Sequence, residues 1–236
     1  MFKNLFGSTS TAPQVAPSSS VIDLTKKAKV SLDKHGLTGQ RAAVYLVLDR
    51  SGSMRPYYKD GTLQHLAEQA LGLSANLDDD GTVPVVFFST KIDGTTEVTL
   101  DNYAGRIEQV HQRLGHMGLT YYEHAIQAVI EHYQASGATD PAFVIFQTDG
   151  SPSNRAAAAR ALRSASNLPL FWVFVGFGKD VAFLEKLDDL SGRAVDNAGF
   201  FHALDPHLVT DEEFYAGITA DFGPWLAAAR GAGILH

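Results

Sequence analysis

Cysteine is absent from the chain: none of its 236 residues carries a thiol. Disulfides, thiolate metal sites and cysteine nucleophiles are therefore excluded, whatever the fold. A chain without disulfides is typical of the reducing cytoplasm, and we expect this location.

Positive charge is also in short supply. Lysine and arginine number 19 against 26 aspartates and glutamates, which gives a net charge of -7. Sequence-independent binding to nucleic acid or anionic lipid needs a basic surface, so the negative net charge argues against both partners. No run approaches the roughly 20 consecutive apolar residues of a membrane span, and residues 1–20 lack the apolar stretch of a secretion signal. We therefore expect a cytoplasmic protein without a membrane span.

The sequence does contain enough apolar material for a core, with 45% hydrophobic and 19% charged residues. Residues 1–20 are rich in Ser, Thr, Pro and Ala, which predicts a flexible tail. Residues 21–39 place apolar side chains at alternating positions around Lys26, Lys27 and Lys29, and we interpret them as an edge strand or a surface strap with a solvated face. The main domain is expected to span residues 40–236, including a helical segment at its C-terminal end.

Continuous apolar runs alternate with helical patterns along this domain. The runs predict buried strands at 42–48, 83–88, 142–147 and 170–176, and shorter strands at 95–100 and 199–203. Helices are predicted at 61–76, 101–114, 122–135, 154–166, 181–190, 211–221 and 224–230. This alternation predicts an α/β fold, a doubly wound and mostly parallel sheet with helices on both faces. In such folds ligands lie at the carboxyl ends of the strands, where the strand order reverses.

Hard oxygen ligands occur at the ends of these strands. Asp49, Ser51 and Ser53 follow the first buried strand at alternate positions, and the glycine between the serines permits the loop to turn so that the side chains converge. Asp149 follows the third core strand, and Thr120 ends a glycine-containing loop just before a helix. Few carboxylates, several hydroxyls and room for water describe a Mg²⁺ site, because that ion prefers octahedral oxygen geometry, whereas Ca²⁺ usually takes more carboxylates.

The string LVLDRSGSM resembles the D-x-S-x-S loop of von Willebrand factor A (vWA) domains, and Gly-Leu-Thr at 118–120 and Thr-Asp-Gly at 148–150 follow in that family's order. The resemblance covers residues 40–205 and implies a Rossmann-like vWA fold with a metal-ion-dependent adhesion site (MIDAS). The flanking stretches DLTKKAKVSLDKHGL and FGPWLAAARGAGIL are similar to those of the bacterial tellurium-resistance vWA proteins of the TerF and TerY kind.

This family implies a cytoplasmic, non-catalytic protein-interaction module within a chemical-stress or tellurium-resistance system. Ser51, Ser53 and Thr120 would coordinate the metal directly or through water, and Asp49 and Asp149 would act through water in one state and directly in another. A metal ringed by neutral hydroxyls keeps more of its positive charge, so an Asp or Glu of a partner protein would complete its coordination. Mg²⁺ is the expected ion, and Mn²⁺ or Ca²⁺ could replace it.

Other functions stay open at this stage. Aspartates and Mg²⁺ in a strand-end cleft also suit a phosphoester hydrolase, although a D-x-D nucleophile loop and a general base beside Asp49 are missing. The chain could instead be a structural subunit of a larger assembly, with the metal as a staple. A zinc site among His111, His116, His124 and His132 is disfavoured because neither an HExxH motif nor a cysteine accompanies them.

Two further expectations concern single residues. Arg50 lies inside the predicted metal loop, and we expect it to be solvated, to repel competing cations or to reach a partner's carboxylate. Trp225, Leu226 and Ile234 are expected to dock against the sheet edge rather than to form a partner surface.

Overall fold

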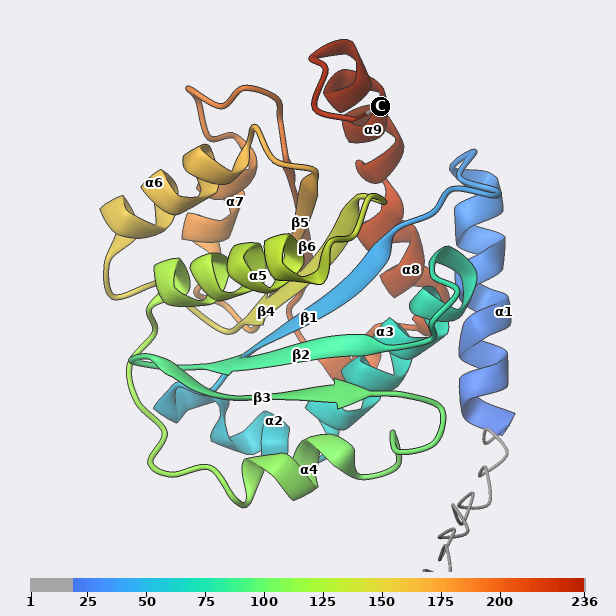
Figure 1. Cartoon of the computed structure of the whole chain (residues 1–236). Coiled ribbons are helices and arrows are strands. Elements are labelled where there is room, and N and C mark those ends of the chain that lie inside the picture. Colours follow the sequence, from blue (N-terminus) through green and yellow to red (C-terminus); the bar gives the residue numbers. More distant parts are fainter. Residues whose placement is uncertain (1–18, 236) are drawn as a thin grey trace, which may run out of the picture.

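A six-stranded sheet organises the computed structural model, which describes residues 19–235 (Figure 1). Its strands are β1 (Ala43–Asp49), β2 (Val83–Phe88), β3 (Ile92–Val98), β4 (Ala142–Thr148), β5 (Leu170–Phe177) and β6 (Ala198–Ala203). The spatial order is β3-β2-β1-β4-β5-β6, and all neighbours are parallel except the antiparallel pair β2 and β3. The predicted mostly parallel α/β sheet is confirmed, and its strand order reverses between β1 and β4.

Helices cover both faces of this sheet (Figure 1). They are α1 (Ser19–Lys34), α2 (Arg55–Lys59), α3 (Thr62–Leu77), α4 (Arg106–His111), α5 (Tyr122–Ser136), α6 (Arg155–Ala165), α7 (Ala182–Asp188), α8 (Asp211–Thr219) and α9 (Phe222–Gly231), with 3₁₀ turns η1 (Gly52–Met54) and η2 (Pro206–Leu208). One core layer lies between the sheet and α1, α3, α8 and α9, and the other between the sheet and α5, α6 and α7. None of these helices is both long and apolar enough to cross a membrane.

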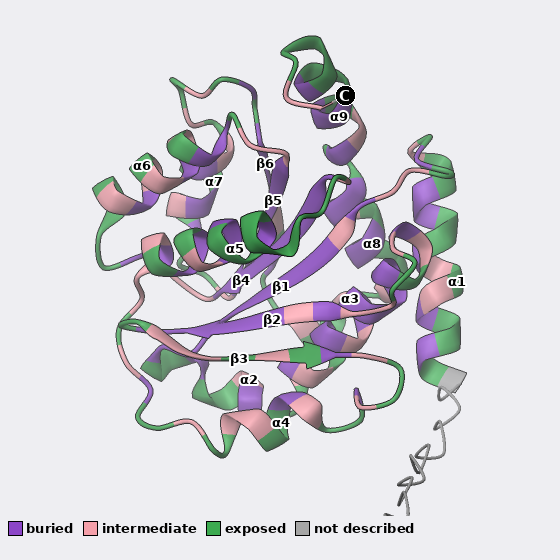
Figure 2. Ribbon diagram, in the orientation of Figure 1, coloured by how far each residue is buried: buried purple, intermediate pink, exposed green. Residues whose placement is uncertain are grey.

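Strand β1 shows why the apolar runs form buried strands. Val44, Leu46 and Leu48 pack into the first core layer, whereas Tyr45 and Val47 pack into the second. All of them are at most 2% exposed, so both faces of the strand are covered (Figure 2). A strand buried on both sides requires an uninterrupted apolar sequence, and this signal located β1, β2, β4 and β5 correctly.

Helix α1 occupies most of the segment 21–39, so the edge strand or surface strap predicted there is wrong. Its inward face has helical spacing and consists of Val21, Leu24, Ala28 and Leu32. Val30, which belonged to the alternating pattern, is 52% exposed. The predicted tail, residues 1–20, lies outside the described residues except for its last two, which begin α1.

The C-terminal segment docks as predicted. Helix α9 begins at Phe222, and Trp225 and Leu226 are at most 3% exposed in the first core layer. The indole of Trp225 stacks on the ring of Phe222, with centroids 5.6 Å apart, and Ile234 packs partly buried against the same layer. Burial of this aromatic pair fastens the end of the chain to the sheet.

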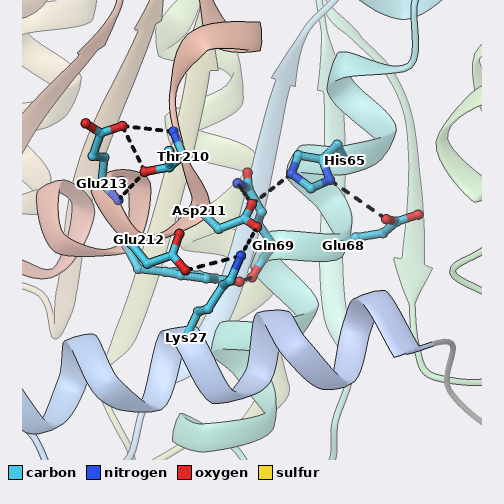
Figure 3. A network of polar contacts seen from close by, with 9 residues as sticks. Lys27, His65, Glu68, Gln69, Thr210, Asp211, Glu212 and Glu213 are labelled. Carbon is cyan, nitrogen blue, oxygen red and sulfur yellow. Dashed lines mark hydrogen bonds and ion pairs between the residues drawn. The ribbon is translucent and has the colours of Figure 1, made fainter.

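A polar network joins α1, α3 and α8 (Figure 3). The Asp211 carboxylate accepts hydrogen bonds from Lys27 Nζ at 2.8 Å and from Gln69 Nε2 at 2.9 Å, and His65 Nε2 lies 2.9 Å away. Burial raises the pKa of this carboxyl, but its hydrogen bonds to Lys27, Gln69 and His65 outweigh burial and hold the pKa below its usual value. Asp211 is therefore more stable ionised in the folded protein than in the unfolded chain.

We expect Asp211→Asn to lower the free energy of unfolding by about 1–2 kcal/mol at pH 7, because the charged hydrogen bond to Lys27 is weakened. A depressed folded-state pKa stabilises the protein above pH 4, and this contribution is lost as the pH falls through the pKa of the folded carboxyl. The difference between variant and wild type should therefore shrink below pH 4 in urea titrations. Asp23→Asn is the matched control, since Asp23 pairs only with the exposed Lys26 of its own helix; an equal loss in both variants would contradict this assignment.

Candidate metal centre

The predicted ligands lie at the point where the strand order reverses. Asp49 is the last residue of β1, and Asp149 directly follows β4, the neighbouring parallel strand. Parallel neighbours end at the same edge of a sheet, so both carboxylates lie at the carboxyl end of the sheet, between β1 and β4. Asp49 is fully buried and Asp149 is half-buried, so Asp49 lies deeper in the protein and Asp149 nearer to solvent.

Hydrogen bonds join four of the five predicted residues. The Asp49 carboxylate accepts from the Ser51 N–H at 2.5 Å and, through its other oxygen, from the Thr148 hydroxyl at 2.6 Å. The Ser51 and Ser53 hydroxyl oxygens are 3.1 Å apart, and Ser53 donates to Asp149 Oδ1 at 2.8 Å. Two carboxylates and two hydroxyls are therefore joined into one chain of hydrogen bonds at the carboxyl end of the sheet.

Thr120 reaches the same place on a separate loop, although its hydroxyl takes no part in this chain of hydrogen bonds. Two residues earlier, Gly118 forms a bridge with Ser51, and its carbonyl accepts from the Gly52 N–H at 3.2 Å. On the other side, the Ser153 N–H donates to the Thr120 carbonyl at 2.7 Å. The Thr120 loop is thus fastened between the loop after β1 and the loop after β4.

The two carboxyl groups of the site both have raised pKa values. Burial raises the pKa of Asp49 to about 7, an effect that hydrogen bonds from Thr148 and Ser51 reduce but do not cancel, and the charge of Asp149 adds to it. Burial likewise raises the pKa of Asp149, with Asp180 contributing repulsion and Ser53 opposing it. Both groups are harder to ionise than usual because they are withdrawn from water, and within residues 19–235 neither carboxylate forms an ion pair.

This donor set fits a hard divalent cation. Ionised Asp49 and Asp149 would supply the charge that such an ion compensates, and Ser51 and Ser53 present neutral hydroxyl oxygens beside them. Within residues 19–235, no three His, Asp or Glu side chains gather in a way that could hold an ion. A site made only of three or more acidic and histidine ligands is therefore not present in this part of the chain.

The roles of several residues at the site were not predicted correctly from the sequence. Arg50 is 1% exposed and pairs with Asp93, so the expectation of a solvated arginine that faces cations or a partner is wrong. Gly52 bends the loop without a left-handed conformation, so the freedom attributed to it is not used. Thr148, which fixes Asp49, could have been found as the polar residue that ends a buried strand. No sequence signal marks Tyr58, whose hydroxyl donates to the Asp49 carbonyl at 3.1 Å.

Comparison with known proteins places this geometry in a family context. The model of the vWA domain found in the C-terminal part of TerF matches residues 41–235. The uncharacterized protein YcbR of Bacillus subtilis is 34% identical over 221 residues, which cover 91% of this chain and 90% of YcbR.

Solved structures with the same fold are more distant in sequence. The von Willebrand factor type A protein from Catenulispora acidiphila shares 22% identity at a TM-score of 0.56, covering 77% of this chain and 42% of that one. Proximal thread matrix protein 1 from the mussel byssus, with a zinc-occupied MIDAS motif, shares 17% identity at a TM-score of 0.55, covering 77% of this chain and 48% of that one. The present chain thus spans less than half of either structure, and the likeness extends to the fold.

Proposed function

Because the chain belongs to the TerF-like von Willebrand factor A domains, we propose that it is a non-catalytic interaction module that binds Mg²⁺ and through it holds a carboxylate of a partner protein. One observation carries this proposal: two carboxylates lie at the strand-order reversal beside serine hydroxyls, and neither is paired with a basic side chain of the described part of the chain. The zinc in the MIDAS of the byssus protein supports a divalent ion at such a site. For the cell, we propose the cytoplasm and a tellurium-resistance-type stress system.

Each side chain has a distinct part in this scheme. Ser51, Ser53 and Thr120 would hold the ion with neutral oxygens, and Asp149 would face it from the opposite loop. Asp49 is fully buried and is positioned by Thr148, whereas Ser53 is exposed and Asp149 half-buried. The bound ion would supply a positive charge that the hydroxyls leave largely uncompensated, and an incoming Asp or Glu would be attracted to it.

The proposal predicts that partner capture depends on both the ion and the buried carboxylate. Tagged wild type is incubated with host lysate in Mg²⁺ and in EDTA, alongside Asp49→Asn in Mg²⁺, and recovered proteins are identified by mass spectrometry. Asp188→Asn is the matched control, because burial and neighbouring Asp221 also raise the pKa of Asp188, to about 6, at the opposite edge of the sheet. We expect one or more proteins recovered only with wild type and the control in Mg²⁺. Loss of capture when the acidic residues of that partner are changed to amides would complete the test.

Two outcomes would replace the proposal. Equal recovery in Mg²⁺ and EDTA, together with a lower melting temperature in EDTA, would make the ion a structural staple. Steady hydrolysis of a generic phosphoester by wild type, absent in Asp49→Asn, would favour the hydrolase. The hydrolase is not expected, because the Asp49 carboxylate accepts hydrogen bonds from the Thr148 hydroxyl and the Ser51 N–H, and the Ser53 hydroxyl donates to Asp149 rather than to a separate general base.

A further inference from the structure

The side chain of Arg50 connects three segments that are distant in sequence. Its Nη1 lies 2.7 Å from the Asp93 carboxylate on β3, its Nε donates to His111 Nδ1 on α4 at 3.1 Å, and its Nη2 donates to the Gly115 carbonyl at 2.8 Å. Arg50 stands between two predicted metal ligands, Asp49 and Ser51. A guanidinium has donors in a rigid fork, which suits it to hold several acceptors at fixed positions.

The partner of this arginine is itself held in place. The Asp93 side chain is 7% exposed, and its second oxygen accepts from the Ser89 hydroxyl at 2.9 Å. A buried ion pair is costly to break, since the remaining charge would be left unpaired. The pair therefore fixes Arg50 against the turn between β2 and β3, and the guanidinium cannot swing out toward a ligand.

His111 completes the arrangement as a neutral acceptor. A guanidinium only donates, so His111 Nδ1 must carry a lone pair and its proton resides on Nε2. Burial lowers the pKa of His111, and the charges of Arg50 and Arg55 lower it further, which favours this neutral form. The imidazole stacks on Tyr58 with ring centroids 4.0 Å apart, and Tyr58 donates to the Asp49 carbonyl.

The loop whose Gly115 carbonyl accepts a hydrogen bond from Arg50 also carries Thr120. Beyond that contact, the Leu119 N–H donates to the Thr90 hydroxyl at 3.0 Å, and the Tyr121 N–H donates to the Ser89 carbonyl at 3.1 Å. The same turn that holds Asp93 thus holds both neighbours of Thr120. Arg50 and this turn form one clamp across the loop 113–121.

We propose that Arg50 is a positioning residue of the metal site, which with Asp93 fastens the loop 113–121 so that Thr120 is held against Ser51 and Ser53. This inference rests on the proposed function for the identity of the site. A loop that is fixed before the ion arrives loses no conformational entropy when the ion binds. The metal affinity is therefore higher than it would be with a mobile loop. Residues that orient metal ligands typically change metal affinity by about 10–100-fold when substituted.

The test compares Arg50→Lys with Arg193→Lys. Lysine can still pair with Asp93 but cannot reach His111 and Gly115 at the same time. Arg193 is a matched control: its side chain is 6% exposed, pairs with Asp196 and donates to two backbone carbonyls, at the opposite edge of the sheet. Both variants should lose similar thermal stability, so a difference between them in metal affinity or in amide hydrogen exchange reports on the clamp.

Two readouts are measured, one of them without metal. Calorimetric titration with Mg²⁺ should give an affinity about 10–100-fold weaker for Arg50→Lys and unchanged for Arg193→Lys. Hydrogen exchange of the metal-free proteins should be faster at the Leu119 and Tyr121 amides in Arg50→Lys alone. If Arg50→Lys does not fold, His111→Phe keeps the ring against Tyr58 and removes only the acceptor of Arg50 Nε; both effects are then expected in the same direction.

The inference is overturned if either readout stays at the wild-type value. Unchanged exchange would mean that Arg50 does not hold the loop, and unchanged affinity would mean that the position of Thr120 does not matter to the ion. If wild type itself binds no Mg²⁺, the proposed function fails, while the exchange rates still decide whether the clamp exists. The two failures are therefore separable.

Discussion

Asp49→Asn should abolish binding of Mg²⁺ and, at the same time, make the metal-free protein more stable at pH 7.5. The asparagine keeps a carbonyl oxygen for the Ser51 N–H and removes a charge that is fully buried. Because the folded-state pKa of Asp49 is about 7 and the ordinary value is 3.8, ionisation opposes folding by about 4 kcal/mol above pH 7. At a few degrees per kcal/mol for a chain of this size, the metal-free variant should melt roughly 10 °C higher.

The pH dependence gives this prediction its sign. Because folding raises the pKa of Asp49, the stability that its protonated form contributes is fully present below about pH 4 and is lost as the pH rises toward 7. Wild type and variant should therefore converge at pH 4 and diverge at pH 7.5 when melted in EDTA. Saturating Mg²⁺ should stabilise wild type alone, by about 3 kcal/mol at a hundredfold excess over the dissociation constant. A variant that melts below wild type at pH 7.5 in EDTA would contradict the electrostatic account of the site.

Removal of residues 1–40 should unfold the protein, although the family match begins at residue 41. Helix α1 buries Val21, Leu24 and Leu32 against α3 and α8. At about 1.5–3 kcal/mol for each large aliphatic side chain, their loss costs about 5–9 kcal/mol, which is comparable with the whole stability of a typical domain. Circular dichroism should show no cooperative thermal transition for the truncated chain.

A chain that begins at Ser19 is the control for this truncation, because it retains α1 entire. Leu24→Ala in the full chain provides an intermediate step and should cost about 2–5 kcal/mol. If the chain from residue 41 melts cooperatively within a few degrees of wild type, α1 is an appendage rather than part of the core. The predicted boundary at residue 40 would then mark a real domain edge.

Sequence patterns predicted the central strands of the sheet more accurately than helices α1 and α4. The runs at β1, β2, β4 and β5 are unambiguous because a strand covered on both faces tolerates few polar residues. Helix α1 was misinterpreted because Ala28, one of its buried positions, carries little hydrophobic signal, while the exposed Val30 carries more. Helix α4 is shorter than the predicted 101–114 since Gly105, in a left-handed conformation, separates the preceding turn from the helix.

For the candidate site, the sequence located the predicted ligands but not the residues that hold them in place. Asp49 and Asp149 could be located because each follows a buried strand, which fixes the edge where it emerges. The role of Arg50 could not be predicted, because its partner Asp93 lies 43 residues further along and only the turn between β2 and β3 brings them together. A charged residue beside a metal loop is ordinarily solvated, and only a tertiary contact reverses that expectation.

The central claim is that the carboxyl end of the sheet, between β1 and β4, holds a divalent cation through hydroxyls and carboxylates from three loops. A crystal of the full chain soaked in Mn²⁺, measured at the manganese absorption edge, tests it most directly. The account predicts one strong anomalous peak about 2–2.5 Å from the Ser51 and Ser53 hydroxyl oxygens, absent from Asp49→Asn crystals treated identically. The absence of a peak beside Ser51 and Ser53 in wild-type crystals at saturating Mn²⁺, or the same peak in both crystals, would contradict this claim.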